Sequence, residues 1–194
     1  MNSLEQIYDR SVFDWHLPFE KDYEAMAAIL VRQFVFHTVI DLGCGNGFML
    51  KHLLLKWHKR VTAVDGSAVF LDYLAPELKP FARVADLAQP LNAGQHHLVI
   101  STEVAEHLPA AAADAFVENL ARHCEHYLVF TAATPGQGGH DHLNEQPMSY
   151  WCEKIKRHGL ELNSATTEAL RTAFSLVIRD VSYITKNLAV FTRP

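Results

Sequence analysis

Short runs of aliphatic residues alternate with longer segments in which apolar residues recur every three or four positions. The first pattern is typical of buried strands and the second of helices that pack on a sheet. The predicted strands cover Val39–Leu42, Val61–Val64, Phe81–Ala85, Leu98–Ser101, Tyr127–Thr131, Leu160–Asn163 and Leu188–Thr192. The predicted helices cover Leu4–Tyr8, Glu20–Phe36, Gly47–Lys59, Val69–Leu74, Ala110–Ala121, Met148–His158 and Glu168–Leu176.

Strands that alternate with helices over short connections predict an α/β fold: a doubly wound, Rossmann-like parallel sheet with helices on both faces. We expect one domain over residues 1–194, with an N-terminal helical or lid segment over 1–36 and the core over 37–194. Apolar residues alternate around Pro18 between Phe13 and Phe19, which predicts a loop or short extended piece. This piece is either a flap over the core or a lid over a ligand.

The first predicted strand ends in a carboxylate and runs into a glycine turn. Asp41 is followed by Gly43, Gly45 and Gly47, and a helix begins just beyond. Glycine allows positive φ and a close approach of ligand to backbone, while the helix start offers unpaired N–H groups. The dinucleotide fingerprint needs its third glycine at position 48, where Phe48 stands. The turn therefore favours a ligand other than a dinucleotide.

Three aspartates share one position relative to the predicted strands. Asp41, Asp65 and Asp86 each lie at or just past a strand end, so a parallel sheet brings all three to one cleft. A carboxylate at Asp65 suits the hydroxyl pair of a ribose. Asp86 and the backbone N–H of Leu87 suit the edge of an adenine. Each aspartate alone would be a common turn or cap residue, but three at one sheet edge favour a nucleoside site.

The composition is that of a globular protein, with 49% hydrophobic and 20% charged residues and a formal net charge of −5. The acidic balance disfavours an extended nucleic-acid surface. Three scattered cysteines without a CxxC pair, a polar N-terminus and the lack of a long apolar run favour a cytoplasmic setting away from membranes. A homodimer is compatible with the sequence, which leaves the oligomeric state open.

The chain resembles the class I S-adenosylmethionine (SAM)-dependent methyltransferases from Tyr8 to Phe191. The glycine turn matches motif I, and the matches to later motifs of the family cover Val61–Asp65, Val84–Leu87 and Leu98–Pro109. Glu106-His107-Leu108 is a run common in the small-molecule branch. The loop from Gly139 to Pro147 resembles small bacterial and phage members. The resemblance implies the strand order 3-2-1-4-5-7-6 with the last strand antiparallel.

The resemblance also implies SAM as cofactor and S-adenosylhomocysteine as product. Asp65 would hold the ribose, Asp86 the adenine, and the Asp41–Gly47 segment the methionine end. Thr102 and Glu103 would lie beside the sulfonium. The expected cofactor-binding residues are Asp41, Gly43, Cys44, Gly45, Gly47, Asp65, Gly66, Asp86, Leu87, Thr102 and Glu103.

Methyl transfer to a hydroxyl group needs a base near the acceptor. We expect this role for His107, His140 or His142, with Glu103 and Glu106 behind them. The His140-Asp141-His142 run also suggests a metal site, but alternate side chains of an extended loop point apart and no further ligand is obvious. We therefore expect a solvated loop or a substrate contact there and no metal. This loop and Phe13–Phe19 would form a two-part lid.

The predicted function is O-methylation of a sugar or another hydroxylated small molecule. Ser101-Thr102-Glu103-Val104 replaces the N-P-P-Y and Pro-Cys motifs of amino- and cytosine-methylating enzymes. The alternatives are an RNA or protein methyltransferase, a nicotinamide-dependent oxidoreductase of the same fold, and a non-catalytic SAM-binding subunit. The sequence does not identify the acceptor.

Overall fold

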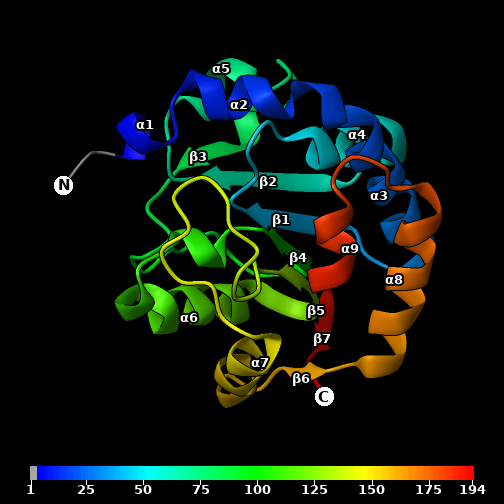
Figure 1. Cartoon of the computed structure of the whole chain (residues 1–194). Helices are drawn as coiled ribbons and strands as arrows, with labels where there is room; N and C mark the ends of the chain where they lie inside the picture. The colour runs from blue at the N-terminus through cyan, green and yellow to red at the C-terminus, as the bar shows by residue number, and fades with distance from the viewer. Residues whose placement is uncertain (1–3) are drawn as a thin grey trace.

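The central sheet orders its strands β3-β2-β1-β4-β5-β7-β6 in the computed structural model, which describes residues 4–194 (Figure 1). β1 to β5 run parallel to one another, whereas β7 lies antiparallel to both β5 and β6. The predicted order and the antiparallel last strand are confirmed. The strands are β1 Thr38–Leu42, β2 Arg60–Asp65, β3 Ala82–Val84, β4 His96–Thr102, β5 Cys124–Thr131, β6 Glu161–Leu162 and β7 Ala189–Thr192.

Helices cover both faces of this sheet because successive strand residues point to opposite sides. Val39 packs with the layer formed by α3 (Glu20–Gln33), α4 (Phe48–Trp57), α8 (Ser164–Val177) and α9 (Ser182–Asn187). Its neighbour Ile40 packs with α6 (Ala113–His123) and α7 (Met148–Arg157) on the other face. The two hydrophobic clusters therefore lie on opposite faces of the sheet.

The prediction of a loop or extended piece at Phe13–Phe19 is wrong, because this segment is helical. α1 (Leu4–Ile7) is followed by α2 (Arg10–His16) and a 3₁₀ turn, η1 (Leu17–Phe19). The side chain of Asp9 caps α2 by accepting the Ser11 N–H at 2.8 Å, and Pro18 fits the start of η1. Only one face of α2 packs inward, so Phe13 is buried while Trp15 is 57% exposed.

Smaller corrections concern helix ends. The predicted Ala110–Ala121 helix begins as a 3₁₀ turn (η4, Ala110–Ala112), and α9 was not predicted from the sequence. The helix α5 (Phe70–Tyr73) has no side-chain cap, and the nearby Ser67 hydroxyl donates to the Tyr8 carbonyl at 2.8 Å. The remaining 3₁₀ turns are η2 (Lys79–Phe81) and η3 (Ala105–His107).

Two segments far apart in sequence cross the carboxyl ends of the strands. The N-terminal helices α1 and α2 lie beside the loop 134–146, which runs in yellow in front of the sheet (Figure 1). The ring of His140 in this loop bonds the Ile7 carbonyl at 2.8 Å. Within residues 4–194, no helix is both long and apolar enough to cross a membrane.

Candidate active site

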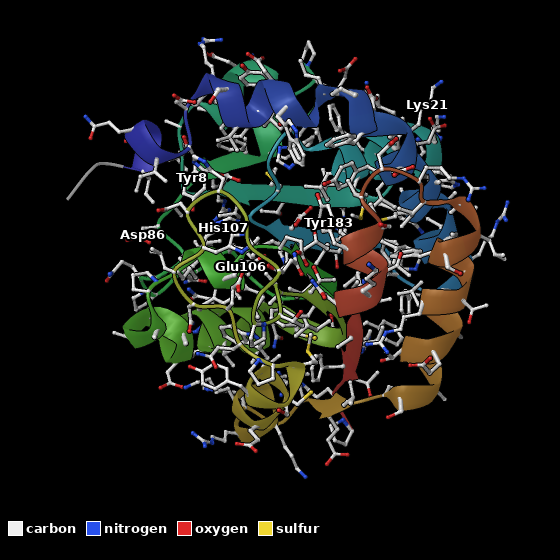
Figure 2. The ribbon with its side chains drawn as sticks, viewed as in Figure 1. Tyr8, Lys21, Asp86, Glu106, His107 and Tyr183 are labelled. Carbon is white, nitrogen blue, oxygen red and sulfur yellow. The ribbon has the colours of Figure 1, made fainter. Side chains whose placement is uncertain are left out.

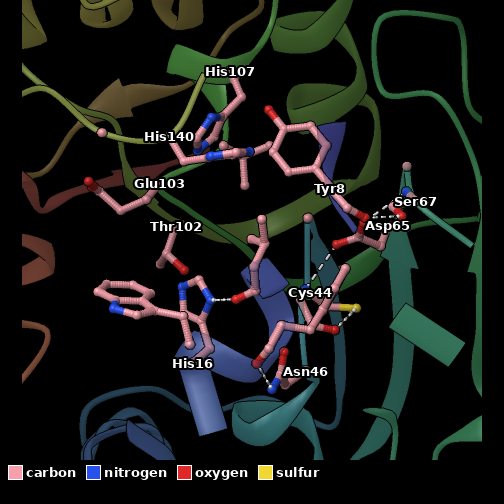
Figure 3. Close-up of a pocket in the computed structure, with 18 of the residues that line it drawn as sticks. Tyr8, His16, Cys44, Asn46, Asp65, Ser67, Thr102, Glu103, His107 and His140 are labelled. Carbon is pink, nitrogen blue, oxygen red and sulfur yellow. Dashed lines mark hydrogen bonds between the residues drawn. The ribbon is translucent and has the colours of Figure 1, made fainter. Parts of the chain in front are cut away.

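A cavity of about 700 Å³ opens at the carboxyl ends of β1, β2 and β4. It collects residues from the N-terminal helices, the glycine turn and the loop 134–146 (Figure 3). Of the residues predicted for the cofactor or for catalysis, those that line it are Asp41, Gly43, Cys44, Gly45, Asp65, Gly66, Asp86, Leu87, Thr102, Glu103, His107 and His140. Gly47 does not line the cavity.

The glycine turn crosses the end of β2, where the backbone N–H groups of Gly43 and Cys44 both donate to the Val64 carbonyl. All three glycines of the turn have positive φ. A Cβ at Gly43 would lie 2.3 Å from Cγ2 of Val104, and one at Gly47 would lie 2.4 Å from a methyl group of Leu74. A Cβ at Gly45 would meet nothing within 4 Å, so this glycine presents bare backbone to the cavity. Gly47 is needed for packing and for the start of α4.

Asp65 joins the second strand to this turn. Its carboxylate accepts the Gly45 N–H and the Ser67 N–H, each at 3.0 Å. Burial raises the pKa of Asp65, and these backbone hydrogen bonds partly offset the rise. The carboxylate is thus held in one orientation with lone pairs left over for a ligand hydroxyl.

Asp41 is a buried carboxylate that lacks a full set of partners. It is 4% exposed, and its Oδ1 has no hydrogen-bond partner among the residues that the structure describes. Burial raises the pKa of Asp41 to about 8, and the nearby Asp65 carboxylate adds to the rise. An orphaned carboxylate in a cavity wall is a good site for a cationic group of a ligand.

The third predicted aspartate has a different environment. Asp86 is exposed and accepts the Ala88 N–H at 2.9 Å, which is the common turn geometry. Leu87 is buried, and the side-chain amide of Asn119 donates to its carbonyl at 3.1 Å. This fixed turn keeps the Asp86 carboxylate at the rim of the cavity.

Glu103 follows β4 with a positive φ of 53°. Thr131 holds this strained turn by accepting the Glu103 N–H. The Glu103 carboxylate accepts amide hydrogen bonds from Gln137 at 2.8 Å and from Asn187 at 3.1 Å. These two partners were not predicted, because one lies in a loop and the other at the end of the unexpected helix α9. Both amides hold the Glu103 carboxylate in one orientation.

His107 and His140 gather at the end of the cavity near Tyr8. Figure 3 shows both imidazoles beside the Tyr8 ring, and the ring centroids lie 5.5 Å and 6.0 Å from that of Tyr8. Nδ1 of His107 faces the Asp141 carbonyl at 3.4 Å. Burial lowers the pKa of His107 to about 4, and the neighbouring His142 adds to the lowering. The His107 ring is therefore neutral near pH 7.

Hydrogen bonds from the core hold the N-terminal segment over the cavity. The side-chain amide of Asn46 donates to the Phe13 carbonyl at 3.0 Å, close to the glycine turn. Together with the Ser67–Tyr8 and His140–Ile7 contacts described above, this bond holds three carbonyls of the segment, those of Ile7, Tyr8 and Phe13. The cover over the cavity is thus built from polar contacts to the same elements that form the cavity wall.

A family model described as a methyltransferase domain matches residues 39–126. The matched segment contains the glycine turn, the three strand-end aspartates and His107. This match and the strand order of the sheet support a class I SAM-dependent methyltransferase. It is an enzyme of methyl transfer with SAM as the methyl donor. No curated protein matches the sequence.

Solved structures share the fold of this methyltransferase at low sequence identity. The sugar N-methyltransferase KedS8 from Streptoalloteichus sp ATCC 53650 is 15% identical with a TM-score of 0.69, over 95% of this chain and 92% of that one. Magnesium protoporphyrin IX methyltransferase (ChlM) from Synechocystis PCC 6803, solved with SAH, is 16% identical with a TM-score of 0.63, over 98% and 92%. Phosphoethanolamine N-methyltransferase 2 from Haemonchus contortus, in complex with SAM, is 13% identical with a TM-score of 0.69, over 100% and 60%.

The cavity of the methyltransferase fits a cofactor that carries positive charge. Its lining includes four carboxylates, from Asp41, Asp65, Asp86 and Glu103. Among the described residues that line it there is no lysine or arginine. SAM bears an ammonium and a sulfonium, so burial of these groups beside unpaired carboxylates is favourable. The open backbone at Gly45 leaves room for the ligand at the same place.

Proposed function

We propose that this methyltransferase transfers a methyl group to a hydroxyl oxygen of an uncharged small molecule, such as a sugar or another hydroxylated metabolite. The observation that carries the proposal is the acceptor end of the cavity, where His107, His140 and Tyr8 meet without a cationic side chain. Imidazole and phenol groups exchange hydrogen bonds with hydroxyls, whereas phosphate or carboxylate groups call for lysine or arginine.

At the cofactor end, the ribose hydroxyls of SAM would bond the Asp65 carboxylate, which the Gly45 and Ser67 N–H groups already orient. The ammonium would approach the unpartnered Oδ1 of Asp41. Asp86 and Leu87 would meet the adenine. Glu103, held by Gln137 and Asn187, would lie near the sulfonium. When bound, SAM supplies a methyl group on a sulfur that is already a good leaving group.

His107 is the proposed proton acceptor. A carbonyl oxygen only accepts hydrogen bonds, so the contact with Asp141 places the proton on Nδ1 of His107. Nε2 then carries the free lone pair. Methylation of a hydroxyl oxygen makes its proton strongly acidic, so even a weak base can remove that proton as the new C–O bond forms. The chain's remaining task is to hold the hydroxyl in line with the methyl group.

The same charge pattern counts against an RNA acceptor. An RNA substrate brings phosphates to the cavity mouth, and these need basic side chains for binding. The four lining carboxylates would repel them. A phosphorylated small molecule is disfavoured for the same reason, although one structural neighbour is named for phosphoethanolamine.

The test is a screen of acceptors with methyl-labelled SAM, arranged as matched pairs of a neutral glycoside or phenol and its phosphate ester. We expect label in the ether product of neutral members only. His107→Ala should lower turnover by about 100-fold or more, the usual contribution of a general base, while S-adenosylhomocysteine still binds. Label transferred only to phosphorylated members, or to RNA, would overturn the proposed acceptor class. Wild-type turnover in His107→Ala would remove His107 as the proton acceptor.

A further inference from the structure

Glu106, His107 and His142 converge behind the acceptor end of the cavity. One potential ligand atom of each residue lies within 4.8 Å of the others. Glu106 and His107 are adjacent in the 3₁₀ turn η3, and His142 comes from the loop 134–146. Figure 2 shows Glu106 and His107 next to Tyr8 in front of the sheet. The rings of His107 and His142 meet edge to face, with centroids 4.9 Å apart.

Glu106 is a fully buried acid whose carboxylate oxygens have no hydrogen-bond partner among the described residues. It is 0% exposed, and neither carboxylate oxygen is bonded within residues 4–194. The backbone N–H groups of Leu143 and Asn144 donate to the Glu106 carbonyl, not to its carboxylate. Burial without a partner is costly for a carboxylate. The side chain is therefore available for a cation.

Both histidines are oriented as metal ligands usually are. Nδ1 of His107 contacts the Asp141 carbonyl, and Nδ1 of His142 contacts Oε1 of Glu145 at 2.8 Å. Glu145 is held in turn by the N–H groups of Gly136 and Gly138. A histidine that donates its Nδ1 proton to a carbonyl or carboxylate keeps the Nε2 lone pair for an ion.

Gly139 leaves the space that His142 needs. A Cβ at this position would lie 2.2 Å from Nε2, 2.5 Å from Cε1 and 2.8 Å from Cδ2 of His142. These three distances place the glycine against the face of the ring, since an approach along the Nε2 lone pair would leave both carbons distinctly farther away. Gly139 therefore does not block the Nε2 lone pair in the ring plane.

We propose that Glu106, His107 and His142 bind a divalent transition-metal ion. Two imidazoles and one carboxylate are a ligand set for Zn²⁺ that leaves a fourth position free. His107 and His142 both line the cavity, so this position faces the acceptor. Bound ligand atoms lie about 2.0–2.2 Å from zinc, so the loop 134–146 would draw inward on binding.

The role of the ion rests on the proposed function. A hydroxyl oxygen of the acceptor at the fourth position would lose its proton more easily, because the ion stabilises the alkoxide. The oxygen lone pair then forms the new bond to the methyl carbon while the S–C bond breaks, and the proton leaves to solvent. In the metal-loaded chain Nε2 of His107 is a ligand and the ion assists deprotonation, whereas in the metal-free chain the same nitrogen is the proton acceptor of the proposed function.

A second cluster, His97, Glu125 and His126, also brings potential ligands together. It lies at the amino ends of β4 and β5, away from the cavity. Nδ1 of His97 accepts the N–H groups of His37 and Thr38, so its Nε2 carries the proton in the neutral ring. That arrangement blocks the nitrogen that faces Glu125. This cluster is therefore the weaker candidate for a metal site.

The protein is stripped with EDTA, reloaded with Zn²⁺ and passed through gel filtration. Elemental analysis then measures the Zn²⁺ that the protein retains, and absorption spectra of the Co²⁺-loaded protein give a second readout. The chain carries His126→Ala in all samples, which removes the second cluster. Glu106→Gln and His142→Ala test the site. His140→Ala is the matched control, because it removes an imidazole from the same loop without touching the cluster. Binding of S-adenosylhomocysteine reports that each variant is folded.

We expect about one Zn²⁺ per chain with and without His140→Ala, and at least 100-fold weaker binding in Glu106→Gln and His142→Ala. If either variant fails to fold, Glu145→Gln should weaken Zn²⁺ binding about 10-fold through the loss of the contact to His142. No retained Zn²⁺, or retention unchanged in these variants, would overturn the metal site. Methyl transfer that persists in metal-free protein would leave the proposed function intact and remove only the role of the ion.

Discussion

The backbone N–H of Gly45 donates a 3.0 Å hydrogen bond to Oδ2 of Asp65. This bond joins the turn after β1 to the carboxylate that ends β2, so the two elements move as one unit. The second oxygen of Asp65 is held by the Ser67 N–H, and Ser67 in turn bonds the Tyr8 carbonyl. A single carboxylate thus connects the floor of the cavity to its cover.

Asp65→Ala should weaken binding of S-adenosylhomocysteine about 10- to 100-fold, since it removes charge-assisted hydrogen bonds to the ligand and frees the turn. Calorimetric titration of purified protein measures the change. Asp114→Ala is a fair control, because Asp114 is exposed and pairs with Lys154 on the far side of the sheet. Equal affinities of wild type and Asp65→Ala would show that the ribose binds elsewhere.

Asp41 makes folding stability depend on pH. Its pKa is about 8 in the folded chain and about 4 when unfolded. Between these values the folded state holds a proton that the unfolded state has lost. The contribution of Asp41 to the free energy of unfolding is therefore fully present below about pH 4 and is lost as pH rises through about 8. In Asp41→Asn this part of the pH dependence should vanish, as melting temperatures over about pH 5 to 9 would reveal. The same dependence of melting temperature on pH in the wild type and in Asp41→Asn would contradict the raised pKa of Asp41.

The same carboxylate should make cofactor binding depend on pH in the opposite direction. An ammonium pairs with the ionised form of Asp41, which becomes populated as pH approaches about 8. Affinity for S-adenosylhomocysteine should rise between about pH 6 and pH 8 in the wild type and stay flat in Asp41→Asn. Titrations in buffers of different ionisation heat would also detect a proton released on binding. A flat wild-type profile would place the ammonium away from Asp41.

Gly43 and Gly45 should respond differently to alanine. A methyl group at Gly43 collides with Val104 at 2.3 Å and adds strain at φ +92°, so we expect a loss of about 2 kcal/mol or more of stability. At Gly45 the methyl meets no protein atom, and φ is +51°. Gly45→Ala should cost only about 1 kcal/mol but weaken cofactor binding strongly. Thermal melts and titrations of the two variants would separate packing from ligand contact.

The cover over the cavity should tighten when cofactor binds. Limited proteolysis should cut within the loop 134–146 and around α1 and α2 in the free protein, and more slowly with S-adenosylhomocysteine. His140→Ala removes the contact to the Ile7 carbonyl and should speed cleavage of both segments. Arg122→Ala, which disrupts an exposed ion pair on α6, is a control with no expected effect. Cleavage at the same rate with and without S-adenosylhomocysteine would show that these segments do not act as a lid.

The sheet and its active edge were predictable because their signals are local. Each strand is a short apolar run. β1 ends next to Asp41, and β2 ends in Asp65. Parallel strands then bring these ends together whatever the exact helix boundaries. Twelve of the predicted site residues line one cavity for this reason. Gly47 lies outside this lining and makes a tight contact with Leu74, which sequence alone does not distinguish from ligand space. Its expected cofactor contact stays a prediction.

The contacts that needed tertiary structure were missed. Glu103 bonds Asn187, whose helix α9 was not predicted, and Gln137 in a loop. Glu106 was predicted as a reserve base behind the histidines, but its full burial beside His142 was not predicted. Alternation of apolar residues at Phe13–Phe19 suggested an extended segment, but the Asp9 cap and packing on one side favour a helix. No local pattern records such long-range partners.

The acidic wall of the cavity also distinguishes the methyl donor from the demethylated product. SAM carries one more positive charge than S-adenosylhomocysteine, because the sulfonium becomes a neutral thioether once the methyl group leaves. In the proposed arrangement Glu103 faces the sulfonium before the reaction and a neutral sulfur afterwards, while the ammonium beside Asp41 is unchanged. Loss of this attraction lowers the affinity for the spent cofactor relative to the fresh one. Exchange of product for donor is thus favoured by electrostatics that the strand ends supply without any moving part.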